Sequence, residues 1–124
     1  EMTSSLVGSE MCIRDRCCGE PNILGWDILR NHATAFVSCP DWVTARGMRT
    51  LGAPEKGDPR VISGESGAVT TGLVETLMLD PEYAELKELI GLDKTSSVLC
   101  FSTEGDTDPD QYRRIVWEGE YPTC

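Results

Sequence analysis

The fold is decided by the stretch Arg60-Val61-Ile62-Ser63-Gly64-Glu65-Ser66-Gly67-Ala68. The run that opens it, Arg60–Ser63, is apolar at its centre and too short for a helix, which predicts a strand. Glycines on either side of the Glu65-Ser66 pair then indicate a tight turn. From Ala68 to Leu79, apolar residues recur on one side at helical spacing. The stretch therefore predicts a strand, a glycine turn and a helix in succession.

A second unit of the same kind begins at Ser97. Residues Ser97–Phe101 form a continuous apolar run, typical of a strand buried on both faces of a parallel sheet. A polar turn, Ser102–Thr107, follows, and Asp108-Pro109 predicts the start of a last helix that continues to Trp117. Two such units separated by helices predict an α/β fold, with parallel strands and flanking helices.

Three other helices are predicted from apolar spacing. The first runs from about Leu24 to Phe36, and the second has Pro40 at its first position and ends at Gly52. The third starts at Asp80-Pro81 and ends at Gly91. Prolines and glycine make residues 53–59 a loop.

Composition narrows the classes of function. The chain has 124 residues and a formal net charge of −10, which fits one domain at most. No segment approaches the roughly eighteen apolar residues that a membrane-spanning helix needs. An acidic chain without a basic stripe also repels phosphate backbones. We therefore expect neither a membrane protein nor a nucleic-acid-binding protein.

Six cysteines leave a secreted disulfide scaffold open, but the chain has enough Leu, Ile and Val for a core, so we interpret them as reduced thiols. No CxxC pair occurs and the single histidine, His32, has no cluster of ligands around it, so no metal site is expected. The N-terminus lacks the apolar segment of a signal peptide. Together these features predict a cytoplasmic protein.

The segment from residue 1 to residue 16 is interpreted as non-native. The ten residues Leu6–Asp15 can be back-translated into a string similar to the adapter and transposase end used in preparing sequencing libraries. A real, irregular N-terminal tail is the alternative. We expect the native sequence to start at Cys17 and to begin within a longer gene.

Both polar turns follow predicted parallel strands. In open α/β sheets, ligands bind outside the carboxyl ends of the strands. Ser63–Gly67 and Ser102–Thr107 are therefore the places where a site is expected.

Five short motifs stand out along the chain: Gly19-Glu20-Pro21-Asn22, Ser38-Cys39-Pro40-Asp41, Gly57-Asp58-Pro59, Ser63-Gly64-Glu65-Ser66-Gly67-Ala68 and Ser102-Thr103-Glu104-Gly105-Asp106-Thr107-Asp108-Pro109. Together they resemble the diaminopropionate ammonia-lyases, over essentially all of residues 18–122. This family is a branch of the pyridoxal-phosphate (PLP) enzymes of the tryptophan-synthase β type, which also include threonine deaminase.

The resemblance implies the C-terminal part of a fold-type II PLP enzyme of amino-acid catabolism. It implies α,β-elimination of 2,3-diaminopropionate to pyruvate and ammonia, in an intact enzyme that is a homodimer acting on a small amino acid. It also implies that Ser102, Thr103, Glu65, Gly64 and Ser66 lie at the cofactor.

Each of these cofactor-binding roles has a purely structural alternative. Ser102 could donate a hydrogen bond to the pyridine nitrogen of PLP or only satisfy amides of its loop. Glu65 could lie beside the ring or only favour the helix dipole. Gly64 and Gly67 allow either close backbone approach or a positive φ.

Other polar residues have weaker claims. Asp106 and Asp108 could form a carboxylate pair, although Asp108, or Thr107 before it, is better explained as a helix cap. His32 is interpreted as a core or subunit-contact residue. Cys39 and Cys100 are interpreted as small buried hydrophobic residues.

No lysine in the chain lies in a context that resembles the catalytic lysine of the family. A PLP enzyme forms a Schiff base with a lysine, and the chain offers only Lys56, Lys87 and Lys94, none in a matching context. The glycine-rich phosphate loop is absent too. We therefore expect no catalytic residue in this chain and no activity from it alone. Another PLP elimination or replacement enzyme, similar to threonine or serine deaminase, and an acidic binding module without cofactor remain as alternatives.

Overall fold

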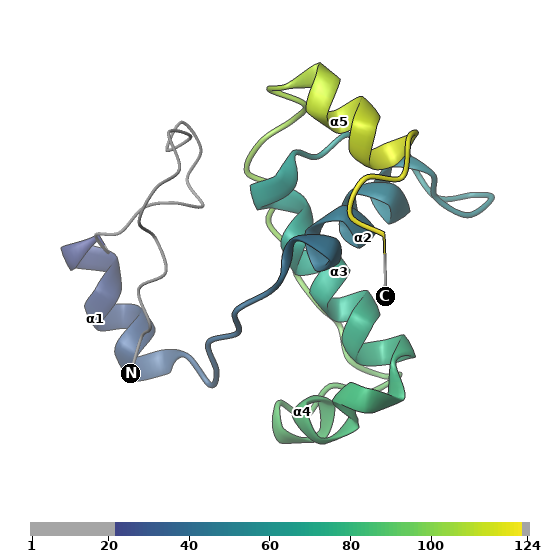
Figure 1. Ribbon diagram of the computed structural model, residues 1–124. Helices are drawn as coiled ribbons and strands as arrows, with labels where there is room; N and C mark the ends of the chain where they lie inside the picture. Colours follow the sequence, from purple (N-terminus) through teal and green to yellow (C-terminus); the bar gives the residue numbers. More distant parts are fainter. Residues whose placement is uncertain (1–21, 123–124) are drawn as a thin grey trace. The chain divides into compact units, whose positions relative to one another are not determined.

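The computed structural model describes residues 22–122, so the proposed adapter segment, residues 1–16, lies outside the described part. The chain divides into two units, one up to Phe36 and one from Val37 onward. The described part of the first is helix α1 (Ile23–His32, Figure 1) and the segment that follows it. The Oδ1 atom of Asn22 accepts hydrogen bonds from the first-turn amides of α1, which starts the helix there.

Helices α2 (Asp41–Gly52) and α3 (Glu65–Leu79) form the centre of the second unit. They cross in direct backbone contact at Gly47 and Gly72. A Cβ atom on Gly47 would lie 2.1 Å from the carbonyl oxygen of Ala68, and one on Gly72 would lie 1.9 Å from that of Val43. These two glycines therefore set how closely the helices approach.

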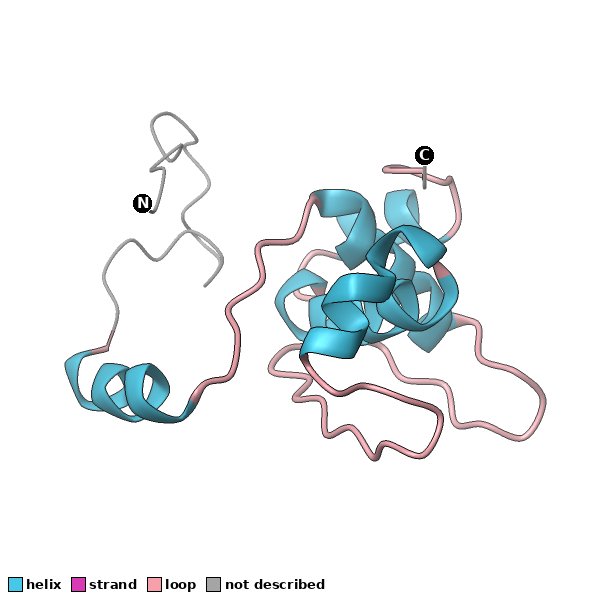
Figure 2. Ribbon diagram, turned by 90° about the horizontal axis from the view of Figure 1, so that it is seen from below, coloured by secondary structure: helices cyan, strands magenta, loops and turns pink. Residues whose placement is uncertain are grey.

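Helix α5 (Pro109–Val116) covers another side of α2, and Figure 2 shows it within the same group of helices. Asp108 caps α5 by accepting a hydrogen bond from the amide of Gln111 at 3.0 Å, which confirms the predicted cap. The buried core lies mainly between these helices and contains Ala45, Met48, Ala68, Tyr112 and Ile115.

The 3₁₀ turn η2 (Pro81–Tyr83) and helix α4 (Ala84–Leu89) follow α3. Arg46 on α2 fastens the end of α3, because its Nη1 atom donates to Asp80 Oδ2 at 2.6 Å and to Thr76 Oγ1 at 3.0 Å. Its guanidinium carbon also lies 5.5 Å from the ring centre of Trp42.

No strand forms among residues 22–122, where the sequence predicts strands at Arg60–Ser63 and Ser97–Phe101. Figure 2 accordingly shows only helices and loops in the described part of the chain. A strand needs a neighbouring strand for its hydrogen bonds, and the described residues pair neither segment with one. The apolar side chains of the second segment are accordingly exposed, with Leu99 at 78% and Phe101 at 70%. The prediction of parallel strands is therefore not confirmed.

The predicted helix boundaries are partly wrong. Helix α1 ends at His32 rather than at Phe36, and Pro40 is the residue before α2 rather than its first residue. Helix α3 begins at Glu65 rather than Ala68, so the predicted glycine turn is the first turn of the helix. The third predicted helix is divided between η2 and α4 and is helical only to Leu89. No helix in the described part is long and apolar enough to cross a bilayer.

Candidate functional site

The two polar turns predicted to hold the site do come together. The amide of Gly64, directly before α3, donates a hydrogen bond of 3.1 Å to the carbonyl oxygen of Glu104. The amide of Ser66, in the first turn of α3, donates to Glu104 Oε1 at 3.0 Å. Residues 38 positions apart in the sequence are thereby held side by side.

Glu104 caps helix α3 from outside the helix. Gly64 has no side chain to accept the amide hydrogens at the start of α3, so a distant carboxylate does so instead. This carboxylate also lies at the positive end of the helix dipole. An anion such as a phosphate group is therefore not expected to bind at this helix end.

Gly64 and Gly67 are needed for close approach and not for an unusual backbone conformation. Gly64 has φ −72°, and Gly67 lies within α3. A Cβ atom on Gly64 would lie 2.6 Å from the carbonyl oxygen of Gly105, and one on Gly67 would lie 2.5 Å from Ser63 Oγ and 2.9 Å from Ser102 Oγ. Both glycines make room for the loop that begins at Ser102.

Two serine hydroxyls meet at this junction. Ser102 Oγ donates to Ser63 Oγ at 2.8 Å, and Ser63 Oγ donates to the carbonyl oxygen of Gly64 at 3.2 Å. Ser63 is 1% exposed, whereas Ser102 is exposed. Ser102 is therefore the residue of this pair that is exposed to solvent, whereas Ser63 is enclosed by protein.

The other candidate residues differ in accessibility. Glu65 is buried, with 5% of its surface exposed, and Thr103 is exposed. The hydroxyl of Ser66 is buried and has no hydrogen-bond partner among the described residues. The amides of Gly64 and Ser66 both donate to Glu104, so neither of these two amides is free to bind a ligand.

The sequence analysis placed Ser63 and Glu104 within the two expected turns but gave neither residue a role. A signal for Glu104 was present, because a helix preceded by glycine needs a cap from elsewhere and Glu104 is an acidic residue in the second polar turn. No feature of the residue pattern distinguishes Ser63 from the other serines of these motifs.

Other polar residues do not join this site. His32 is exposed on α1, so the described part does not place it in a core. No group of His, Cys, Asp or Glu within residues 22–122 is arranged to hold a metal ion. Lys56 and Lys94 are exposed residues outside the helices.

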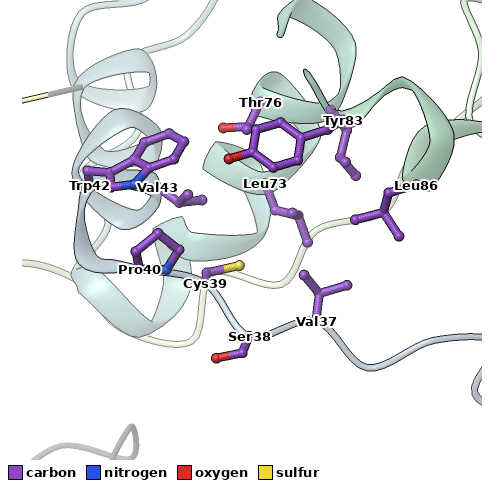
Figure 3. A pocket seen from close by; sticks show the side chains of 11 residues that line it. Val37, Ser38, Cys39, Pro40, Trp42, Val43, Leu73, Thr76, Tyr83 and Leu86 are labelled. Carbon is purple, nitrogen blue, oxygen red and sulfur yellow. The ribbon is translucent and has the colours of Figure 1, made fainter. Parts of the chain in front are cut away.

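An apolar cavity of about 60 Å³ lies between α2, α3 and the turn after α3 (Figure 3). Cys39, Trp42, Leu73, Tyr83 and Leu86 are among the residues that line it. Ligand pockets usually measure about 300 Å³ or more, so this cavity is too small for a cofactor. Cys39 is half-buried, and burial raises the pKa of its thiol.

Comparisons with known proteins agree with the motifs. The chain is 52% identical over 117 residues to diaminopropionate ammonia-lyase of Escherichia coli K12, an alignment that covers 93% of this chain and 29% of that enzyme. No family model matches the chain. The chain thus spans less than a third of the length of the curated relative that it matches.

Two solved structures of that E. coli enzyme are similar to the chain. One, in complex with D-serine, has a TM-score of 0.81 and 54% sequence identity and covers 86% of this chain and 27% of its own. The other, in complex with an aminoacrylate–PLP azomethine reaction intermediate, has a TM-score of 0.80 at the same identity and covers 86% of this chain and 28% of its own. The chain is therefore related to a C-terminal part of diaminopropionate ammonia-lyase.

Proposed function

We propose that this chain is part of a PLP-dependent ammonia-lyase that converts 2,3-diaminopropionate to pyruvate and ammonia by α,β-elimination. The observation that carries the proposal is the junction of Ser63–Gly67 with Ser102–Gly105, because both turns carry motifs of that family. The 52% identity over 93% of the chain supports the same conclusion.

The residues at the junction fit the nitrogen end of a pyridine ring. PLP, when bound, supplies an electron sink for a carbanion formed on the substrate. A neutral ring nitrogen is a hydrogen-bond acceptor, and the exposed hydroxyl of Ser102 is a donor that can rotate toward it. The buried Ser63 hydroxyl cannot be reached in this way.

Ser102 would hold the ring nitrogen without fully protonating it, because a neutral hydroxyl is a far weaker acid than a carboxylic acid. The ring then withdraws electrons less strongly, which favours elimination over transamination. Glu104 supports this arrangement indirectly, since its carboxylate and carbonyl fasten the Ser102 loop to α3.

The remaining predicted residues take secondary roles in this proposal. Glu65 would lie beside the ring, the exposed Thr103 would offer a further hydroxyl, and the Ser66 hydroxyl, buried and without a partner among the described residues, would be a further donor. Gly64 contributes by allowing the loop to approach. The Schiff-base lysine and the phosphate loop come from the part of the enzyme outside this chain.

The intact enzyme is proposed to be a cytoplasmic homodimer. In it, residues 60–63 and 97–101 join a parallel sheet, where strands from the rest of the enzyme cover their exposed apolar side chains.

A chimera tests the activity directly. In this full-length chimera, the chain replaces the matching part of the E. coli enzyme. We expect it to bind PLP, seen as visible absorbance after dialysis, and to release pyruvate from 2,3-diaminopropionate. The chain alone is expected to do neither.

Threonine and D- and L-serine serve as competing substrates, and faster pyruvate or 2-oxobutyrate release from one of them would favour the deaminase alternative. A folded chimera without PLP binding would favour the binding module.

Substitution of Ser102 tests its role in the chimera. Ser102→Ala leaves the ring nitrogen without its donor, and an unsatisfied buried acceptor costs about 1–3 kcal/mol. If the transition state bears this cost, kcat is expected to fall roughly 5- to 150-fold. Ser102→Asp keeps the nitrogen protonated and is expected to increase transamination. Thr103→Ala is the matched control, and a loss of activity there but not in Ser102→Ala would assign the contact to Thr103.

A further inference from the structure

The hydroxyl of Ser63 forms part of a chain of hydrogen bonds that ends on a backbone carbonyl of the protein. Ser102 donates to Ser63 at 2.8 Å, and Ser63 donates to the carbonyl oxygen of Gly64 at 3.2 Å. In this direction the only proton of the Ser102 hydroxyl is used inside the protein. Ser102 could then accept a hydrogen bond from a ligand but could not donate one.

Reversal of the chain frees the proton of Ser102. A hydroxyl has one donor and two acceptor positions and rotates to suit its partners. If Ser63 donates to Ser102 across the same 2.8 Å, the proton of Ser102 points away from Ser63. The change gives up only the 3.2 Å contact with Gly64, whose carbonyl still accepts from the amide of Ala68 at 3.0 Å.

We propose that Ser63 is a positioning residue, whose buried hydroxyl donates to Ser102 and directs the Ser102 proton toward the nitrogen of the bound pyridine ring. This inference rests on the proposed function, because it needs a ring acceptor next to Ser102. Only hydroxyl rotations are involved, and no covalent bond changes.

The surroundings of the pair support this role. Ser63 is 1% exposed, so water does not compete for its hydroxyl. A Cβ atom on Gly67 would lie 2.5 Å from Ser63 Oγ and 2.9 Å from Ser102 Oγ, so the glycine keeps the space in which the two hydroxyls meet. Among the described residues, the Ser102 hydroxyl has one other polar contact, with the carbonyl oxygen of Glu104 at 3.5 Å, which is too long to orient it firmly.

A double-mutant cycle in the full-length chimera tests the proposal. The quantity measured is the dissociation constant of PLP, obtained from visible absorbance. We expect Ser63→Ala to weaken PLP binding roughly 2- to 10-fold, the range for one net hydrogen bond. In the Ser102→Ala background the same substitution is expected to have no further effect, since the hydroxyl it orients is gone. Equal effects in the two backgrounds would overturn the proposal.

Thermal unfolding with and without PLP separates positioning from a purely structural role. Ser63→Ala is expected to reduce the increase in Tm that PLP produces, and Ser63→Cys, which keeps a weak donor, to restore part of it. Thr76→Val removes a different buried hydroxyl, which lies on α3 and away from Ser102, and should lower Tm equally with and without PLP. The same pattern for Ser63→Ala would contradict positioning. If the unmodified chimera bound no PLP, both the proposed function and this inference would be wrong.

Discussion

Helices α2 and α3 and the extended segment Ser97–Phe101 all carry apolar residues, but the apolar side chains of the two regions have opposite environments. Across the α2–α3 crossing, Val43, Ala45, Met48 and Ala68 are at most 3% exposed. In the extended segment, Val98, Leu99 and Phe101 are between 49% and 78% exposed.

The difference follows from where each element finds its hydrogen bonds. A helix satisfies its backbone internally, so two helices need only complementary surfaces, here provided by Gly47 and Gly72. A strand needs at least one neighbouring strand for its backbone hydrogen bonds. Within residues 22–122 no strand lies beside Ser97–Phe101, and its apolar side chains stay exposed.

The largest expected effect sharpens this comparison by measuring Leu99→Ala in two backgrounds. In the full-length chimera, where we expect Leu99 to be buried in a sheet, the substitution should cost about 2–5 kcal/mol of unfolding free energy. In the chain alone, where Leu99 is 78% exposed, the cost should stay within about 0.5 kcal/mol. Denaturant unfolding measures both values, and equal costs would show that the sheet does not cover Leu99.

A substitution at the crossing should break the packed region. Gly72→Ala places a methyl group 1.9 Å from the carbonyl oxygen of Val43, so α2 and α3 must separate. We expect a loss of about 3 kcal/mol, measured by denaturant unfolding of the full-length chimera. The control is Gly25→Ala in α1, where a Cβ atom meets nothing within 4 Å and stability should not fall. Equal results for the two variants would refute the close crossing.

The cap of α5 tests a smaller contribution to the packed region. Asp108→Ala removes the acceptor of the Gln111 amide and should lower stability by about 1 kcal/mol. Asp110→Ala is the matched control, because it removes an acidic residue from the same first turn without removing the cap. A larger loss in the control would mean that charge at the helix end, and not the cap, stabilises α5.

The smallest expected effect concerns the turn that leads into the extended segment. Hydrogen bonds from Thr95 and Ser96 lower the pKa of the exposed Asp93 carboxylate. Because the folded pKa is below the unfolded value of about 3.9, the stability that these hydrogen bonds contribute is fully present above that pH. It is lost as the pH falls through the folded pKa. Amide exchange of Thr95, which donates to Asp93 Oδ1 at 2.7 Å, should show less protection at the acidic end. Asp93→Asn should abolish that pH dependence.

Local chemistry in the sequence was sufficient for most helices. Apolar spacing, Asp108 before Pro109 and Gly52 predicted where α2 and α5 lie to within one or two residues. The same reasoning placed the two polar turns as a site, and the structure brings them together. These features depend on neighbours close in the sequence, whose effects can be derived from residue types alone.

Tertiary contacts decided the rest. Helix α3 begins at Glu65, where Glu104, from a turn far along the chain, accepts a hydrogen bond from the amide of Ser66. The pairing of Ser63 with Ser102 likewise depends on the space that Gly67 leaves. The predicted strands did not form among residues 22–122 because a strand is stabilised by partners, and an apolar run specifies its own tendency but not the presence of its neighbours.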